Sequence, residues 1–108
     1  MIFEERIYEI PNNVRKAFHE RFENHAMRIM KSYGFEVVGC WDEMIGDMQN
    51  FVYILKWSDL NTRQEAWAKF NADEEWVQIK IDSFKQHGQL VAKTSNKILS
   101  PTKYSPIN

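Results

Sequence analysis

The chain has 108 residues, enough for one domain, because two halves of this length would each bury too little apolar surface to offset the entropy lost on folding. Its composition, 44% hydrophobic and 14% aromatic with few Gly and Pro residues, suits a packed globular protein and excludes a disordered one. The net charge of -1 argues against a nucleic-acid-binding protein, since phosphate neutralisation needs clustered Lys and Arg in excess.

The N-terminal third of the chain predicts a strand and then a helix. Residues 2–10 (IFEERIYEI) are rich in Ile, Phe and Tyr, and the proline that follows ends the strand because it cannot donate to a sheet ladder. Asn12 or Asn13 can cap a helix over about residues 14–33, which Gly34 ends. One face of this helix carries the apolar residues Phe18, Phe22, Ala26, Ile29 and Tyr33.

The middle of the chain predicts a hairpin. Residues 35–45 (FEVVGCWDEMI) and 51–57 (FVYILKW) have the composition of strands. The GDMQN segment between them has the length and composition of a hairpin loop, so we expect the two strands to pair antiparallel.

The C-terminal half predicts two helical segments, a last strand and an irregular tail. A helix starts at Ser58 or Asp59 and continues through residue 70, and Asp73 caps a further short helix. Residues 88–99 (GQLVAKTSNKIL) predict the last strand. Residues 100–108 contain two prolines and are expected to form an extended tail of a single domain spanning the whole chain.

The predicted order is β-α-β-β-α-β, the ferredoxin-like α+β arrangement, in which both helices cover one face of a four-stranded antiparallel sheet. The other face needs a cover of its own, because the strand at 51–57 is apolar on both sides. Along this strand, one side carries Phe51, Tyr53, Leu55 and Trp57, and the other side carries Val52 and Ile54. The simplest cover is the same face of a second copy, so the sequence predicts a homodimer formed through the sheet faces.

Two residues on the predicted helices are candidates for chemistry. His25 lies within the apolar face of the first helix and should point at the sheet, as either a hydrogen-bonded core residue or a general base facing a pocket. Arg63 lies on the same side of the second helix as Trp67, so its charge faces the core and must be paired, bound to an anion or extended to the rim. Extension to the rim or pairing with a strand carboxylate such as Glu4 is favoured over anion binding.

The first strand and the tryptophans offer further candidates. Glu4, Arg6 and Tyr8 share one side of the strand, as either a solvated face or a satisfied polar cluster within a dimer interface. Aromatic residues dominate the burial energy of small domains, so core packing is the simplest role for the tryptophans. The alternative is that two or three of them form the wall of a pocket. The four are Trp41, Trp57, Trp67 and Trp76.

Several function classes are not indicated. The chain has no Gly-rich phosphate loop, no Cys or His at metal-binding spacing and no nucleophile elbow, so we predict no cofactor and no metal. The third strand lacks the ribonucleoprotein motif, which argues against RNA binding. A single cysteine, Cys40, indicates a reducing compartment, and no apolar run is long enough to span a bilayer, so we expect a cytoplasmic protein without a membrane partner.

Motifs along nearly the whole chain resemble the NIPSNAP family, a branch of the dimeric α+β barrel superfamily. They are E-x-R-x-Y from Glu4, F-x-x-H from Phe22, the hairpin GFEVVGCWDEMIGDMQNFVYILKWSDLNTR, the DEEW segment and the tail NKILSPTKYSPI. One departure is Glu74 within DEEW, where many members have proline. The resemblance implies a homodimer with a cleft between the sheet and the helices, and it implies no particular reaction.

Two functional hypotheses follow from the resemblance. The first is an enzyme or binder similar to cofactor-independent monooxygenases, acting on a small aromatic or apolar molecule, with His25 as the candidate catalytic residue. Its pocket would be lined by His25, Arg63, Tyr53, Trp67, Trp41 and Tyr8. The second is a non-catalytic dimeric module whose polar groups serve assembly. Haem-degrading relatives look dissimilar, since the second helix contains no histidine and His87 follows the next helical segment.

Overall fold

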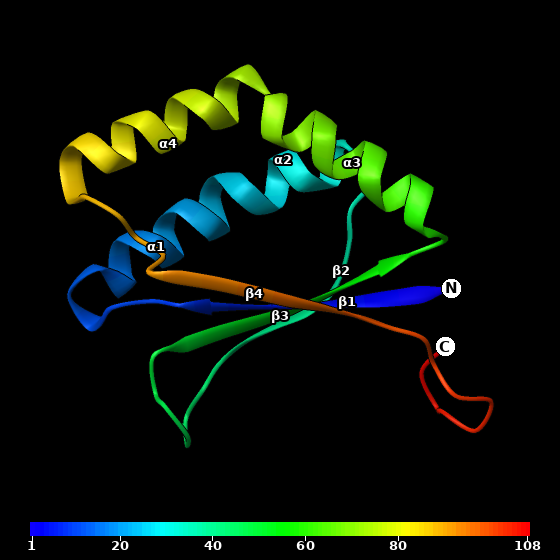
Figure 1. Ribbon diagram of the computed structural model, residues 1–108. Coiled ribbons are helices and arrows are strands. Elements are labelled where there is room, and N and C mark those ends of the chain that lie inside the picture. Colours follow the sequence, from blue (N-terminus) through cyan, green and yellow to red (C-terminus); the bar gives the residue numbers. More distant parts are fainter.

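One antiparallel sheet organises the computed structural model, which describes residues 1–108. The strands lie in the order β2-β3-β1-β4. Their bounds are β1 (Ile2–Glu9), β2 (Glu36–Asp42), β3 (Asn50–Trp57) and β4 (Lys93–Leu99). All the helices lie on one side of this sheet (Figure 1). The predicted ferredoxin-like fold is confirmed, and its second helical segment consists of two helices, giving β-α-β-β-α-α-β.

The first helical segment is continuous but changes its winding along its length. A 3-10 turn (Asn12–Val14) leads into α1 (Arg15–Arg21), a π-helical turn (Phe22–Ala26) and α2 (Met27–Ser32). No asparagine side chain caps its start, so that part of the prediction is wrong: Pro11 opens a 3-10 turn closed by a backbone bond between Pro11 and Val14 instead. Gly34, at a φ of 86°, ends the segment as predicted.

The other two helices begin at the predicted aspartates. The Asp59 carboxylate accepts the backbone N–H of Thr62 at 2.7 Å, at the start of α3 (Leu60–Ala72). The Asp73 carboxylate accepts the backbone N–H of Trp76 at 2.8 Å, at the start of α4 (Glu74–His87). Because Asp73 itself has an extended backbone, with a ψ of 125°, it ends α3 and redirects the chain into α4.

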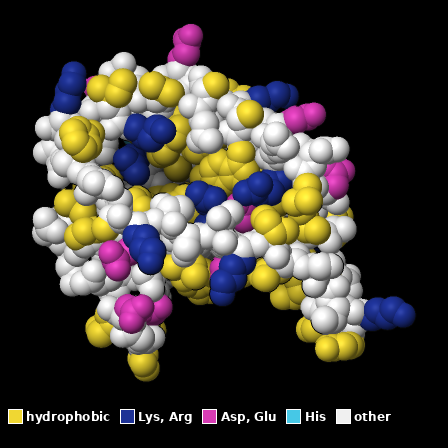
Figure 2. All heavy atoms as spheres, viewed as in Figure 1, with side chains coloured by type: hydrophobic (Ala, Val, Ile, Leu, Met, Phe, Trp, Pro, Cys, Tyr) yellow, Lys and Arg dark blue, Asp and Glu magenta, His cyan; other side chains and the backbone are white.

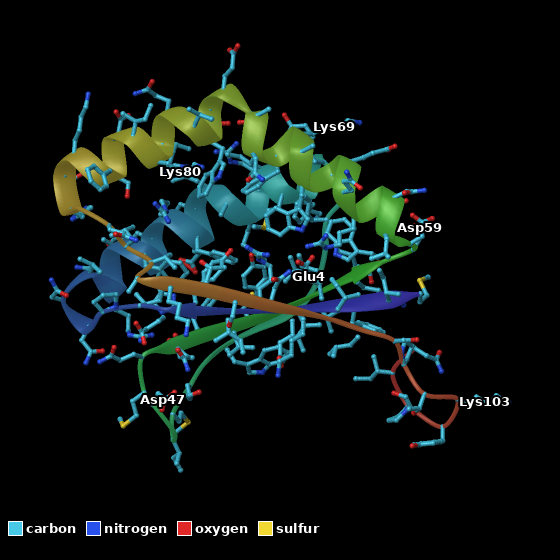
Figure 3. All side chains as sticks on the ribbon, in the orientation of Figure 1. Glu4, Asp47, Asp59, Lys69, Lys80 and Lys103 are labelled. Atoms are coloured by element: carbon cyan, nitrogen blue, oxygen red, sulfur yellow. The ribbon has the colours of Figure 1, made fainter.

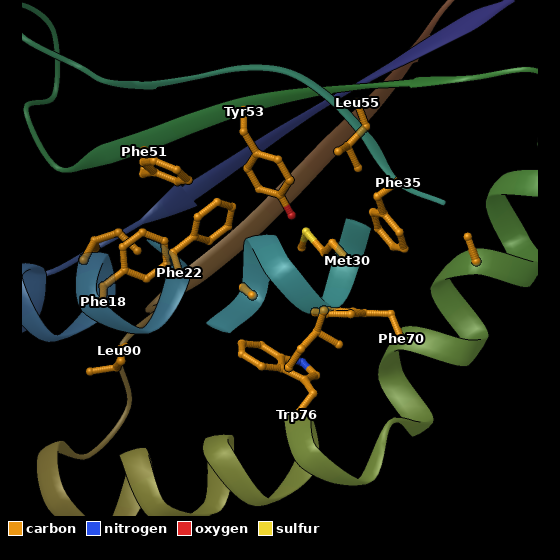
Figure 4. Close-up of a cluster of buried hydrophobic side chains, with 14 of the residues drawn as sticks. Phe18, Phe22, Met30, Phe35, Phe51, Tyr53, Leu55, Phe70, Trp76 and Leu90 are labelled. Carbon is orange, nitrogen blue, oxygen red and sulfur yellow. The ribbon is translucent and has the colours of Figure 1, made fainter. Parts of the chain in front are cut away.

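The core fills the space between the sheet and the helices (Figure 4). Strand β3 supplies its centre, since Phe51, Tyr53, Leu55 and Trp57 are each at most 4% exposed. Their outward-facing neighbours are half-buried, as the predicted alternation requires. The helices supply the opposing aromatic and aliphatic side chains, which are Phe18, Phe22, Ala26, Ile29, Met30, Ala66, Phe70 and Trp76.

Two strands are shorter than predicted, each because a turn claims the residues at one end. Strand β2 stops at Asp42, where the Glu43 carboxylate accepts the backbone N–H of Met48 at 2.9 Å and closes a loop that leaves Ile45 92% exposed. Strand β4 begins at Lys93, because Gly88 takes a φ of 78° and the next residues form a connection.

The face of the sheet opposite the helices is partly covered by the C-terminal tail. Residues 100–108 turn beyond the end of β4 (Figure 1), and Lys56 Nζ donates to the backbone oxygen of Asn108 at 3.2 Å. The tail lines a shallow apolar hollow with Phe3 and Ile54. Trp41 also belongs to this face and is 51% exposed, so its predicted core position is wrong. No helix is both long and apolar enough to cross a membrane.

Candidate functional site

A buried carboxylate on the central strand is the focus of the polar groups between sheet and helices. Glu4 is 0% exposed and lies beneath the helices (Figure 3). Its Oε1 accepts three hydrogen bonds, each of 3.0 Å: from Trp57 Nε1, from Arg63 Nε and from Trp67 Nε1. The predicted pairing of Arg63 with the Glu4 carboxylate is therefore confirmed.

The second carboxylate oxygen of Glu4 also accepts three hydrogen bonds. Its Oε2 accepts from Arg63 Nη2 at 2.9 Å, from Asn96 Nδ2 at 3.0 Å and from Arg6 Nη1 at 3.2 Å. Burial alone would raise the pKa of Glu4, but the hydrogen bonds from Arg63, Trp67 and Asn96 outweigh it and hold the pKa at about 2. Glu4 is an anion at neutral pH and has no lone-pair direction left for a ligand or for proton transfer.

Strand register explains why this cluster assembles. Strand β1 lies between β3 and β4, and residues at alternate positions on it face the helices. Arg6 is placed between Tyr53 on one neighbouring strand and Asn96 on the other. The E-x-R-x-Y pattern therefore puts a carboxylate, a guanidinium and a phenol in one row along the middle of the sheet.

Arg6 continues the row into a pair of tyrosines. Its Nε donates to the Tyr53 hydroxyl at 2.9 Å and to the Tyr8 hydroxyl at 3.3 Å, and the two hydroxyl oxygens are 2.6 Å apart. Burial would lower the pKa of Arg6, but Tyr53, Tyr8 and Glu4 raise it above its ordinary value. Burial, together with Tyr8, raises the pKa of Tyr53 well above its ordinary value. Arg6 is thus a fixed cation beside two tyrosine hydroxyl groups.

A cavity of about 260 Å³ lies beside this row, between the sheet and the helices. Its wall is largely aromatic, and the charged side chains that line it are all cationic. The aromatic members are Tyr8, Phe18, Phe22, Trp67, Phe70 and Trp76, and the cationic members are Arg6, Arg21 and Lys80. Figure 2 shows Lys and Arg side chains next to hydrophobic ones at the hollow between the helices and the sheet.

The structure brings four of the residues predicted for a pocket to this region. Tyr8 and Trp67 line the cavity. Tyr53 lies behind them, fully buried, and reaches the cavity wall through its bond to the Tyr8 hydroxyl. Arg63 is held by both oxygens of Glu4 and does not line the cavity.

The other two predicted pocket residues lie elsewhere. His25 lines an open groove between the first helical segment and α4, and its Nδ1 lies 3.4 Å from Arg28 Nη2. The prediction that His25 points at the sheet is wrong. Residues 22–26 form a π-helical turn, and the extra residue in this turn rotates His25 away from the side of the helix that faces the sheet. After the irregularity in β2 between Val37 and Gly39, Trp41 pairs with Val52 on the outer side of the sheet, and it lines a separate hollow at the edge of β2.

The cavity also contains two residues that the sequence reasoning did not single out. Arg21, on α1, follows Phe18 by three residues, and Lys80, on α4, follows Trp76 by four. Residues at these spacings share a helix face. A cation one turn from a core aromatic residue was therefore the sequence feature that could have indicated these two lining residues. No group of three or more His, Cys, Asp and Glu side chains is arranged to hold a metal ion.

A second hollow, of about 440 Å³, runs along the exposed edge of β2 and is more open to solvent. His19 and Asp42 lie on its rim, with Nε2 and Oδ2 3.0 Å apart, and Arg15 also bonds Asp42 at 2.9 Å. These contacts lie at the solvent-exposed edge of the sheet and contribute little to stability. Cys40 is exposed overall, but partial desolvation raises the pKa of its thiol and makes it a poorer nucleophile.

The fold defines the class of protein. Several solved structures share this fold over nearly the whole chain, including a NIPSNAP family protein of unknown function from Agrobacterium tumefaciens. It is 30% identical, with a TM-score of 0.86 over 100% of this chain and 94% of that chain. A second NIPSNAP family protein from the same organism is 23% identical, with a TM-score of 0.88 over 99% and 98%.

More distant structures share the fold alone. An antibiotic biosynthesis monooxygenase is 10% identical, with a TM-score of 0.60 over 94% of this chain and 99% of that chain. The comparison with curated proteins gives no match. The model of the NIPSNAP family matches residues 3–106, and the chain belongs to this family.

Proposed function

We propose that this NIPSNAP protein binds a small organic molecule in the cavity between its sheet and helices. The observation that carries the proposal is the cavity of about 260 Å³, with largely aromatic walls and three cationic side chains supplied by three different elements. Ligand sites in proteins commonly combine apolar walls with a small number of placed polar groups, in volumes of roughly 300 to 1,000 Å³. This cavity lies just below that range, so it suits a ligand smaller than a typical drug molecule.

The residues around the cavity support binding more than catalysis. Arg6 is fixed by Glu4, Tyr8 and Tyr53, so it can orient a ligand without paying the entropy of ordering itself. The predicted general base, His25, lies outside the cavity. The alternative function, a monooxygenase acting on an apolar or aromatic substrate, would therefore need another group to exchange a proton, and Tyr8 and Lys80 line the cavity.

We also propose that the functional unit is a homodimer formed through the outer sheet faces. Ile7 and Val52 sit opposite one another on β1 and β3, on the side away from the helices, and both are half-buried. With the exposed ring of Trp41 they form an apolar surface that a second copy would cover. The polar cluster around Glu4 lies on the other face, which argues against a module whose polar groups serve assembly.

The dimer is tested by light scattering after size exclusion. Val52→Lys places a charge in the proposed interface, and the expected result is a monomeric mass at micromolar concentration with the helical content retained. Val77→Lys, on the exposed side of α4, is the matched control and should remain dimeric. A monomeric wild-type protein would refute the proposed dimer. We further propose the cytoplasm as the location, since the free thiol of Cys40 is exposed and suits a reducing compartment.

Ligand binding is tested with a library of small aromatic compounds and ligand-observed NMR. Ala26 lines the cavity and is 1% exposed, so Ala26→Leu should fill part of the space and remove binding. Ala68→Leu makes the same change on the exposed surface of α3 and should leave binding intact. If Ala26→Leu is folded and still binds the same compounds with unchanged affinity, the ligands use another site and the proposed function is wrong.

A further inference from the structure

We infer that the cavity selects a small aromatic carboxylate over a neutral compound of the same shape. This inference deepens the proposed function and rests on it. It is carried by the charge of the lining, which comprises Arg6, Arg21 and Lys80 and contains no carboxylate. The three cations come from β1, α1 and α4, so the fold gathers them from distant parts of the chain.

Two of the three cations have no anionic partner. Arg21 makes a single side-chain hydrogen bond, from Nη1 to the Ser83 hydroxyl at 3.4 Å, and forms no ion pair. Lys80 is exposed and makes no side-chain hydrogen bond and no ion pair, whereas the structure contains four Arg–carboxylate ion pairs elsewhere. Figure 3 shows Lys80 on the side of α4 that faces the rest of the domain. An anion in the cavity would supply the missing partner.

The partial burial of Arg21 makes this arrangement costly without an anion. Burial lowers the pKa of Arg21, and the hydroxyl of Tyr8 offsets only part of the effect. A guanidinium that loses water and gains no carboxylate is stabilised only weakly. Arg6 adds to the positive potential, because it shares the one charge of Glu4 with Arg63 and its Nη2 makes no hydrogen bond.

Aromatic rings hold the cations in place and form the walls that a flat ligand would meet. The Arg6 guanidinium carbon is 4.3 Å from the centre of the Trp67 ring. Arg21 and Lys80 share Trp76, at 5.3 Å and 5.8 Å from its centre. Each cation therefore has one side against a ring and can turn its N–H groups toward the cavity. The walls suit stacking and the cations suit a carboxylate, so the best fit is a one- or two-ring acid.

A phosphate ester suits this cavity less well. Proteins bind phosphate with several backbone N–H groups at a glycine-rich loop or a helix start, and the cavity lining contains no glycine. A planar carboxylate needs only one or two charged donors, which guanidinium groups supply in matching geometry. Phosphate esters are therefore a competing ligand class that the experiment should find weaker.

The test compares 1-naphthoate with the neutral 1-naphthamide, using full-length protein at pH 7, isothermal titration and quenching of tryptophan fluorescence. The acid should bind the wild type roughly tenfold or more tightly than the amide, the equivalent of one charge-assisted hydrogen bond. In Arg21→Gln/Lys80→Gln that preference should disappear while amide binding is retained. Lys69→Gln/Lys85→Gln removes the same charge from exposed positions and should keep the preference.

The outcomes separate this inference from the proposed function. If both compounds bind equally to the wild type, or the double variant keeps the preference, the cavity binds ligands but the charge inference is wrong. If naphthyl phosphate binds more tightly than naphthoate, the assignment to carboxylates is wrong. If neither naphthyl compound nor the phosphate binds at millimolar concentration, both the inference and the proposed function fail. Circular dichroism confirms that each variant is folded.

Discussion

Two groups of cations lie between the sheet and the helices, and they differ in what surrounds them. Arg63 and Arg6 converge on Glu4, whose two oxygens accept six hydrogen bonds. Arg21 and Lys80, which also line the cavity, lie against the Trp76 ring, and Arg21 makes one long hydrogen bond to the Ser83 hydroxyl. The first group is complete within the protomer and so serves the fold, whereas the second leaves donors that a ligand can use.

Removing Glu4, the anion that Arg63 and Arg6 share, should have the largest effect on stability. Glu4→Ala would leave Arg63 and Arg6 buried without their carboxylate, and breaking a buried charge cluster in this way costs about 3 to 5 kcal/mol. Urea unfolding should therefore show a large loss in the free energy of unfolding. Glu65→Ala, at an exposed position on α3, is the control and should change it by less than about 0.5 kcal/mol. Similar losses for the two variants would contradict a structural role for Glu4.

Acid should weaken the same cluster reversibly. Because the pKa of Glu4 falls from 4.5 to about 2 on folding, its contribution is fully present above pH 4.5 and is lost as the pH falls toward 2. The loss should be on the order of 3 kcal/mol across this window. Urea unfolding at several pH values measures it, with Glu4→Gln as reference. The stability difference between wild type and Glu4→Gln should shrink as the pH falls, and a constant difference would refute the assignment.

A smaller effect is expected where the Glu4 cluster meets the cavity. Tyr53→Phe removes a hydroxyl that accepts from Arg6 at 2.9 Å and bonds Tyr8 at 2.6 Å. Leaving a buried donor without its acceptor costs about 1 to 3 kcal/mol, although Arg6 keeps its bond to Tyr8. Thermal unfolding should show this loss, together with weaker ligand binding as Arg6 becomes less fixed. A variant as stable as the wild type would show that Tyr8 and Glu4 position Arg6 without Tyr53.

The sequence predicted the fold because its signals were local and strong. Asp59 and Asp73 mark two helix starts through hydrogen bonds that reach only three residues along the chain. The alternation along β3 specifies one buried face, and the buried face in turn fixes which residues of β1 join it. Pairing of Arg63 with Glu4 could be predicted for the same reason, since both lie on faces directed at the core.

The candidate site was less predictable because small irregularities rotate side chains. One extra residue in the helix turns His25 away from the sheet, and one in β2 moves Trp41 to the outer face. Neither irregularity has a reliable signature in sequence. Arg21 and Lys80 were missed for a different reason: a cation on a helix usually indicates a solvated face, and only the packing of α4 against the first helical segment turns both toward one cavity.

The smallest predicted effect separates the two groups of cations most directly. Arg21→Met keeps the length of the side chain and removes a charge that has no anionic partner, so the free energy of unfolding should change by less than about 1 kcal/mol and can rise. Arg63→Met, the matched change, removes both of its bonds to Glu4 and should cost about 3 kcal/mol or more. Urea unfolding of the ligand-free proteins measures both. If Arg21→Met is as damaging as Arg63→Met, Arg21 serves the fold, and the cavity loses the cation that makes a carboxylate its preferred ligand.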